Sequence, residues 1–174
     1  GAKPIFVDIN LDSFNIDVKK IEKEITKRTR AIIPVHEFGM AAEMKKILSL
    51  AKKHHLVVIE DAACALGAKY KNQSVGTFGD FGSFSLHPRK SITSGEGGLL
   101  VVKNKEKYKL IKALRNHGIT HSKNGPEFSH AGFNYRMTDI QAALVKGQLT
   151  RLKNITKKRE KIFKRYNKLI DLSW

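Results

Sequence analysis

The stretch LVVIEDAA occupies residues 56–63, and the stretch SFSLHPRKSITSGEGGLL follows at residues 83–100. The first is a short apolar run rich in Val and Ile, which is typical of a strand buried on both faces of a sheet. Two more runs of this kind, PIFVD at residues 4–8 and AIIPV at residues 31–35, precede it. The three runs predict the first strands of a largely buried sheet.

Helical patterns separate these runs. Asp17 can cap a helix over residues 18–25, where apolar residues recur at helical spacing. A second helix is predicted over residues 41–55 for the same reason. Strands that alternate with helices favour an α/β fold with a mainly parallel sheet and right-handed crossovers. Ligands of such sheets bind beyond the carboxyl ends of the strands, which is where Asp61 falls.

The second half of the chain repeats the alternation less regularly. Apolar runs at residues 81–86 and 97–102 predict two more strands, one on each side of the loop that holds Lys90. A helix is predicted over residues 104–118, ending at Gly118. Residues 121–133 have no clear period and are predicted to form a loop. From residue 138 to residue 169 the pattern predicts a long helical segment, broken once near Gly147 or Asn154.

Lys90, Asp61 and several short hydroxyl side chains form the chemically informative group. Pyridoxal phosphate, an aldehyde cofactor, needs one amine, one acid and a cradle for its phosphate. Lys90 can supply the amine, and Asp61 can keep the pyridine nitrogen protonated. Ser83, Ser85 and the glycine-rich turn at residues 95–98 offer hydroxyl donors and a permissive backbone. Alone, the lysine could lie on the surface and the acid could cap a helix, so their order and spacing carry the inference.

Several motifs occur together over nearly the whole chain. They are EDAA at residues 60–63, HPRK at 87–90, GEGG at 95–98 and FNYRMTDIQAA at 133–143. As a set they resemble the DegT/DnrJ/StrS family of sugar aminotransferases, which depend on pyridoxal phosphate and have fold type I. The resemblance implies part of the large domain of that fold, a three-layer α/β/α arrangement around a mainly parallel sheet. It also implies transfer of an amino group from an amino acid donor, usually glutamate, to a nucleotide-linked keto sugar in polysaccharide or amino-sugar biosynthesis.

The resemblance assigns roles to individual residues. It implies that Lys90 holds the cofactor covalently and later moves the proton between substrate and cofactor, while Asp61 pairs with the pyridine nitrogen. Ser85 matches a hydroxyl that binds the cofactor phosphate. Asn134 matches a residue that reaches the phosphate from the partner subunit, which implies a homodimer with shared active sites. Cys64 stands where many members carry Gln or His beside the ring oxygen of the cofactor, and a thiol is only a weak donor.

The sequence allows two interpretations for each of three further residues. Tyr135 and Arg136 could face the substrate or its nucleotide phosphates. Equally, Tyr135 could pack within the fold and Arg136 could pair with Asp139. His36 follows a predicted strand near the expected substrate entrance, yet a structural role is at least as well supported by the sequence.

The length of 174 residues suits one sizeable domain or part of a larger one. Members of the family are longer, so the resemblance implies a fragment. We expect residues 1–136 to form the cofactor-binding large domain without its N-terminal segment. Residues 137–174 are expected to form a helical segment that leads to an absent C-terminal small domain. An inactive or incomplete fragment of such an enzyme is therefore an alternative.

The charge offers a second alternative, a basic nucleic-acid-binding protein. Lys and Arg number 33 against 16 acidic residues, for a net charge of +17, and such an excess can bind phosphate backbones. The basic residues are spread over helical segments without a zinc-ligand cluster or a helix-turn-helix pattern, which favours solvated helix faces. The lone Cys64 cannot make an internal disulfide, and one cysteine is no metal framework. No apolar run approaches the ~18 residues of a membrane span, so we expect a cytoplasmic protein without a membrane partner or a metal.

Overall fold

A four-stranded sheet forms the centre of the computed structural model, which describes residues 1–170. Its strands are β1 (Ala31–Ile32), β2 (Val57–Asp61), β5 (Phe81–Ser85) and β6 (Gly98–Val102), in the order β1-β2-β5-β6. The β1–β2 and β2–β5 pairs are parallel, and only β6 runs antiparallel to its neighbour. The predicted α/β fold with a mainly parallel sheet is therefore confirmed.

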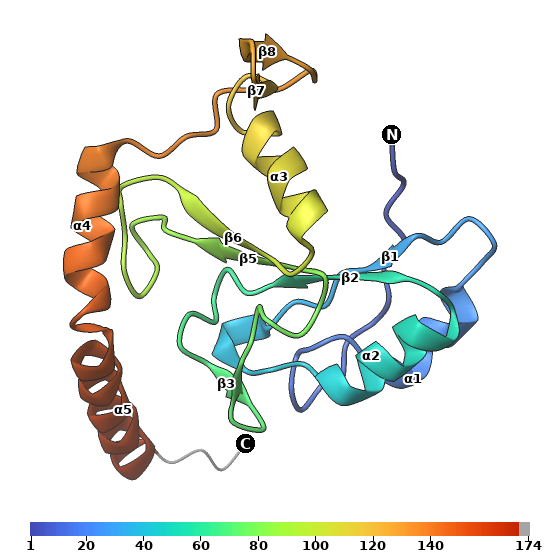
Figure 1. Cartoon of the computed structure of the whole chain (residues 1–174). Helices are drawn as coiled ribbons and strands as arrows, with labels where there is room; N and C mark the ends of the chain where they lie inside the picture. The colour runs from blue at the N-terminus through green and yellow to red at the C-terminus, as the bar shows by residue number, and fades with distance from the viewer. Residues whose placement is uncertain (171–174) are drawn as a thin grey trace.

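Helices cover both faces of the sheet (Figure 1). The short helix α1 (Val18–Ile21), its extension η1 (Glu22–Glu24) and α2 (Met44–Lys53) lie on one face, and α3 (Lys105–Leu114) lies on the other. Asp17 caps α1 as predicted, because its carboxylate accepts a hydrogen bond from the amide of Lys19 at 3.0 Å. This arrangement is the three-layer α/β/α fold.

The main core lies between α2 and the sheet. The face of α2 that carries Met44, Ile47 and Ala51 is buried, as the spacing of i, i+3 and i+7 requires. These side chains pack against Ile32 of β1 and Val58 of β2. Burial of this stripe fixes the position of β2 and therefore the position of the residues that follow it.

Two helices flank the loop between β5 and β6. Helix α4 (Asp139–Leu149) begins with a capping box in which Thr138 and Gln141 bond each other's backbone amides. Helix α5 (Leu152–Leu169) follows after a break at residues 150–151, which lies between the two predicted positions. The two helices pack on the loop through a cluster of Leu86, Ile92 and Val145, with Leu152 and Ile155 against it. The domain boundary at residue 136 stays a prediction, and residues 171–174 lie outside the described part of the chain.

Two sequence predictions were wrong. Residues 4–8 form no strand, since within the described residues no neighbouring strand pairs with them, and Phe6 is 90% exposed. Apolar composition alone does not make a strand without an edge to bond. Residues 121–133 are not simply a loop, because β7 (Ile119–Ser122) and β8 (Gly125–Phe128) form a hairpin. The turn Lys123-Asn124 and the positive φ of Gly125, 110°, make this hairpin possible.

The remaining elements are short. Strands β3 (Lys69–Tyr70) and β4 (Gln73–Ser74) form a small hairpin, and η2 (Glu37–Gly39) follows β1. Strand β1 is shorter than the predicted run of residues 31–35 because Pro34 has no amide hydrogen to donate. Beyond it, a single bridge from Val35 to Asp61 continues the pairing with β2. Every helix in the described part of the chain is too short or too polar to cross a lipid bilayer.

Candidate functional site

A cavity of about 570 Å³ lies beyond the carboxyl ends of β2 and β5. Its walls come from the turn after β2, from the loop between β5 and β6, and from α5. The lining residues are Ala63, Cys64, Leu66, Ser85, His87, Arg89, Lys90, Ser91, Glu96 and Arg159. The cavity therefore lies where a parallel sheet is expected to bind its ligand.

Lys90 is held at the cavity wall by the turn that precedes it. Its backbone amide donates to the carbonyl of His87 at 2.9 Å, and its ammonium Nζ lies 3.0 Å from Sγ of Cys64. The loop that carries Lys90 is closed at its base, because the amide of Ser94 donates to Leu86 O at 3.1 Å. Buried Ile92 anchors the middle of the loop. Lys90 and Cys64, which were predicted as separate cofactor contacts, thus lie next to each other on the cavity lining.

Asp61 is the last residue of β2 and is fixed on both sides. Its amide donates to Pro34 O and its carbonyl accepts from the amide of His36, each at 2.9 Å. The carboxylate Oδ1 accepts from the amide of Ala63 at 3.0 Å. Asp61 does not line the cavity, but Ala63 does, so the carboxylate is bonded to the backbone of a lining residue.

Ser85 lines the cavity at the end of β5. Its hydroxyl oxygen accepts a hydrogen bond from the amide of His87 at 3.3 Å, which leaves the hydroxyl hydrogen available to a ligand. Two residues earlier on the same strand, Ser83 pairs in register with Asp61. Neighbouring strands therefore place Asp61 and Ser85 at the same edge of the sheet.

Asn134, Tyr135 and Arg136 lie outside the cavity lining. All three are exposed, and Asn134 forms an isolated backbone bridge with Asn116. Tyr135 stacks on Phe133 with ring centroids 5.3 Å apart. Arg136 donates to the side-chain oxygen of Asn116 and forms no ion pair with Asp139 among the described residues. Within one chain these three residues do not join Lys90.

His36 has a structural role that involves a buried acid, Glu60. Both side chains are fully buried, and their Nε2 and Oε2 atoms lie 2.9 Å apart. The Nδ1 atom of His36 accepts from the amide of Ala42 at 3.1 Å, so the ring proton is on Nε2 and is donated to Glu60. His36 is therefore a neutral partner of the carboxylate and faces the core instead of a substrate.

Glu60 was not identified from the sequence as more than the neighbour of Asp61. Its two oxygens accept from His36 and from the backbone amides of Gly76, Phe78 and Gly79 at 2.6 to 2.9 Å. Burial raises the pKa of Glu60, but the hydrogen bonds from His36 and the three amides outweigh burial and hold the pKa below its usual value. The carboxylate thus ties the loop of residues 75–79 to the strand that ends in Asp61.

Arg159 is another lining residue that the sequence analysis missed. It follows the half-buried Leu152 and Ile155 at i, i+3 and i+7 on the face of α5 that packs on the loop, and is itself exposed. A charged residue on that face, where an apolar one is expected, was the available signal. Arg159 lines the cavity from α5 and adds a third cation to it.

Comparisons with known proteins agree with this arrangement. Residues 1–172 match the model of the DegT/DnrJ/EryC1/StrS aminotransferase family. GDP-perosamine synthase of Caulobacter vibrioides is 42% identical over 162 residues, which are 93% of this chain and 43% of that protein.

Two solved structures are similar over nearly the whole chain. The aminotransferase PseC of Helicobacter pylori, involved in the biosynthesis of pseudoaminic acid, has a TM-score of 0.93 and 34% identity, covering 98% of this chain and 46% of PseC. The PLP form of the putative sugar aminotransferase Spr1654 of Streptococcus pneumoniae has a TM-score of 0.89 and 33% identity, covering 97% of this chain and 48% of Spr1654.

The chain spans less than half the length of each of these three proteins. The match to the family model nevertheless extends from residue 1 to residue 172. The chain therefore belongs to the DegT/DnrJ/EryC1/StrS aminotransferase family.

Proposed function

We propose that this chain carries the cofactor site of a pyridoxal-phosphate-dependent sugar aminotransferase. The single observation that supports this most is the position of Lys90, which lines the 570 Å³ cavity together with Ser85, while the carboxylate of Asp61 accepts a hydrogen bond from the amide of Ala63 on the same lining. An amine, a hydroxyl and an acid at one edge of a parallel sheet are the groups that this cofactor requires.

The residues present fit the cofactor. The cavity walls carry three cations, Arg89, Lys90 and Arg159, against one carboxylate, Glu96, which suits a ligand with a phosphate group. When bound, pyridoxal phosphate supplies an electron sink for the chemistry at the amino carbon.

Each protein group has a defined task in this proposal. The amine of Lys90 holds the cofactor and, once released, carries a proton between donor and acceptor. Asp61 keeps the pyridine nitrogen protonated, and the Ser85 hydroxyl binds the phosphate. Cys64 lies 3.0 Å from the amine of Lys90 and would be the residue beside the ring oxygen of the bound cofactor.

The substrates in this proposal are an amino acid donor, such as glutamate, and a nucleotide-linked keto sugar. The support comes from the relatives, since GDP-perosamine synthase bears the name of a nucleotide-linked amino sugar and PseC serves amino-sugar biosynthesis. We place the reaction in surface polysaccharide or amino-sugar formation in the cytoplasm, where a lone thiol such as Cys64 persists.

A homodimer with shared sites belongs to the same proposal. Asn134, Tyr135 and Arg136 are exposed on the segment before α4 and do not line the cavity of their own chain. A second copy could present them to the cofactor phosphate and to the substrate. Cross-linking of the holo form through a cysteine placed at residue 134 and Cys64 of the other copy would test this arrangement.

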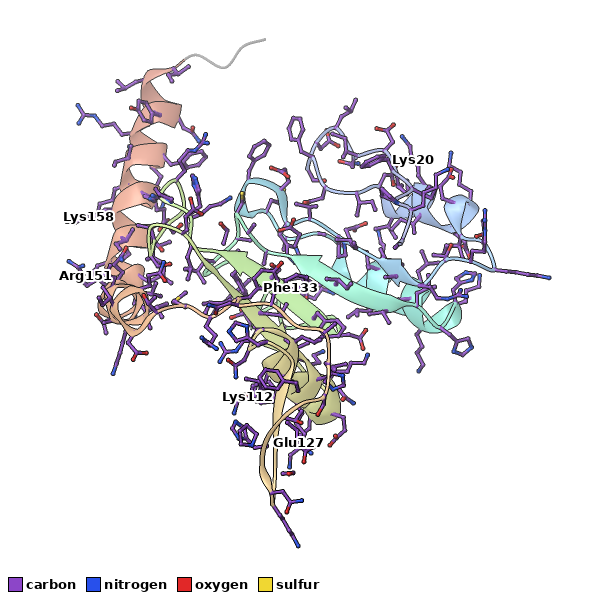
Figure 2. The ribbon with its side chains drawn as sticks, turned by 90° about the horizontal axis from the view of Figure 1, so that it is seen from above. Lys20, Lys112, Glu127, Phe133, Arg151 and Lys158 are labelled. Carbon is purple, nitrogen blue, oxygen red and sulfur yellow. The ribbon has the colours of Figure 1, made fainter. Side chains whose placement is uncertain are left out.

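The function is tested by trapping the cofactor. The purified chain is titrated with pyridoxal phosphate, its absorbance spectrum is recorded, and borohydride reduction is followed by peptide mapping. We expect one modified lysine, Lys90, and its loss in Lys90→Ala. Lys112→Ala, which removes an exposed lysine of α3 (Figure 2), is the matched control.

The outcome separates this function from its alternatives. Equal labelling in Lys90→Ala would refute the assignment of Lys90. If the chain is an incomplete fragment, we expect no labelling of this chain. A version extended to the length of its relatives would then be labelled. If the chain is a nucleic-acid-binding protein, we expect no labelling in either version.

A further inference from the structure

Three cations line the cavity, and only one of them is needed to hold an aldehyde. Lys90 supplies the amine, which leaves the guanidinium groups of Arg89 and Arg159 without an assigned role. The one acid on the lining, Glu96, lies 4.0 Å from His87. Within residues 1–170 neither Arg89 nor Arg159 forms an ion pair. The two guanidinium groups are therefore available to an anionic ligand.

Arg159 is held in place by the packing of α5. Leu152 and Ile155, on the same face of the helix, pack against the cluster of Leu86, Ile92 and Val145. Leu66 belongs to both the cavity lining and this cluster, so the apolar contact extends to the cavity itself. Arg159, four residues after Ile155, therefore lines the cavity from a helix that is packed on the loop.

Arg89 lines the same cavity from the loop between β5 and β6. Its backbone amide donates to Nδ1 of His87 at 3.2 Å, which fixes the turn immediately before Lys90. The hydroxyl groups of Ser85 and Ser91 lie on the same lining. Planar guanidinium groups and hydroxyls together match the oxygens of a phosphate group, and two arginines match its two negative charges.

We propose that Arg159 and Arg89 form a phosphate-binding subsite of this cavity. The proposal rests on the proposed function for the identity of its ligand. The phosphate belongs either to the cofactor or to the diphosphate of a nucleotide-linked sugar. In both cases Arg159 of α5 binds the phosphate group and Arg89 assists it from the lysine loop.

Three probes distinguish the two sources. Pyridoxal phosphate and pyridoxal share the aldehyde and differ only in the phosphate, while inorganic pyrophosphate represents the diphosphate of a substrate. Dissociation constants are measured by absorbance for the first two and by calorimetry for pyrophosphate. Circular dichroism of each variant verifies that it is folded.

The variant is Arg159→Gln, and the control is Lys158→Gln. Lys158 is the neighbouring residue of α5, does not line the cavity and lies on the outer side of the helix (Figure 2). Both substitutions remove one positive charge, so they differ only in the direction of the side chain.

We expect Arg159→Gln to weaken the binding of one phosphate probe on the order of tenfold, the usual effect of losing a charge-assisted hydrogen bond. If Arg159→Gln binds pyridoxal phosphate more weakly than the parent does but binds pyridoxal equally well, the subsite belongs to the cofactor. If Arg159→Gln weakens the binding of pyrophosphate alone, the subsite belongs to the substrate. Lys158→Gln is expected to bind all three probes as the parent does.

The proposal is overturned if Arg159→Gln binds both phosphate probes as tightly as the parent, if Lys158→Gln weakens them equally, or if the parent binds neither. Its failure is distinguishable from failure of the proposed function. Trapping of pyridoxal on Lys90 does not need a phosphate and reports the function alone. Pyrophosphate binding that depends on Arg159 reports the subsite alone.

Discussion

Replacing Glu60 by Gln isolates the contribution of one buried carboxylate to the fold. In the native protein Oε1 accepts from the amides of Phe78 and Gly79, both at 2.6 Å. Oε2 accepts from His36 at 2.9 Å and from the amide of Gly76 at 2.7 Å. A glutamine has the same shape but presents an NH₂ group in place of one oxygen. In either orientation, two of these four donors then face another donor.

The expected cost follows from those two lost bonds. Hydrogen bonds to a charged group are worth about 1.5–3 kcal/mol each, and the donors left behind are buried and cannot turn to water. Part of this loss is offset because a neutral amide is cheaper to bury than a carboxylate. We therefore expect Glu60→Gln to lower the free energy of unfolding by about 3 kcal/mol, a large share of the ~5–15 kcal/mol typical of a domain.

Urea unfolding followed by circular dichroism measures this difference. The midpoint is expected to fall while the slope with urea concentration stays the same. Glu43→Gln is the matched control, because the side chain of Glu43 lies in an exposed ion pair with Lys46 at 2.8 Å, and surface pairs contribute little. A loss below about 1 kcal/mol in Glu60→Gln would refute the view that the buried carboxylate organises this part of the fold.

The same experiment has a pH dependence of known sign. The pKa of Glu60 lies below its ordinary value of 4.5 in the folded protein. The carboxylate therefore contributes stability that is present above that value and is lost as the pH falls through the lower, folded pKa. The difference in midpoint between parent and Glu60→Gln should narrow as the pH falls below about 4.5. A difference that widens on acidification would contradict the assigned direction.

Two further substitutions test the site and the sheet. In Cys64→Gln an amide replaces the thiol 3.0 Å from Lys90. One added hydrogen bond to the ring oxygen should tighten the binding of pyridoxal phosphate about fivefold by absorbance titration, and weaker binding would count against that role. In Gly82→Ala the new methyl group, at the buried position of β5, would overlap the backbone carbonyl of Gly76. Such overpacking should lower the free energy of unfolding by about 1–3 kcal/mol, measured by thermal unfolding. An unchanged midpoint would show that the loop of residues 75–79 moves to accommodate the methyl group without cost.

The elements of the fold that could be predicted are those that a local sequence pattern indicates. The strand that ends in Asp61 is marked by an apolar run of residues 56–60, and α2 by a stripe at helical spacing. In both cases the pattern lies within a few consecutive residues, so both elements were predicted. Residues 4–8 have an equally apolar pattern, but a strand also needs a neighbour, and the pattern says nothing about one.

The site was predicted to the extent that its residues belong to compact motifs. Lys90, Cys64 and Ser85 belong to such motifs and meet at one cavity. The bond between His36 and Glu60 joins residues 24 positions apart in the sequence, and no local period signals it. Arg159 reaches the cavity only because α5 packs on the loop after β5, a contact that depends on the tertiary structure.

The bonds from Glu60 have a consequence for the exchange of amide hydrogens with solvent. The amides of Gly76, Phe78 and Gly79 belong to a segment without regular secondary structure, which would ordinarily open and exchange quickly. Because their acceptor is a fully buried side chain of β2, they can open only when the centre of the sheet opens. This irregular loop is therefore expected to exchange as slowly as the strand beside it and to unfold with it as one cooperative unit.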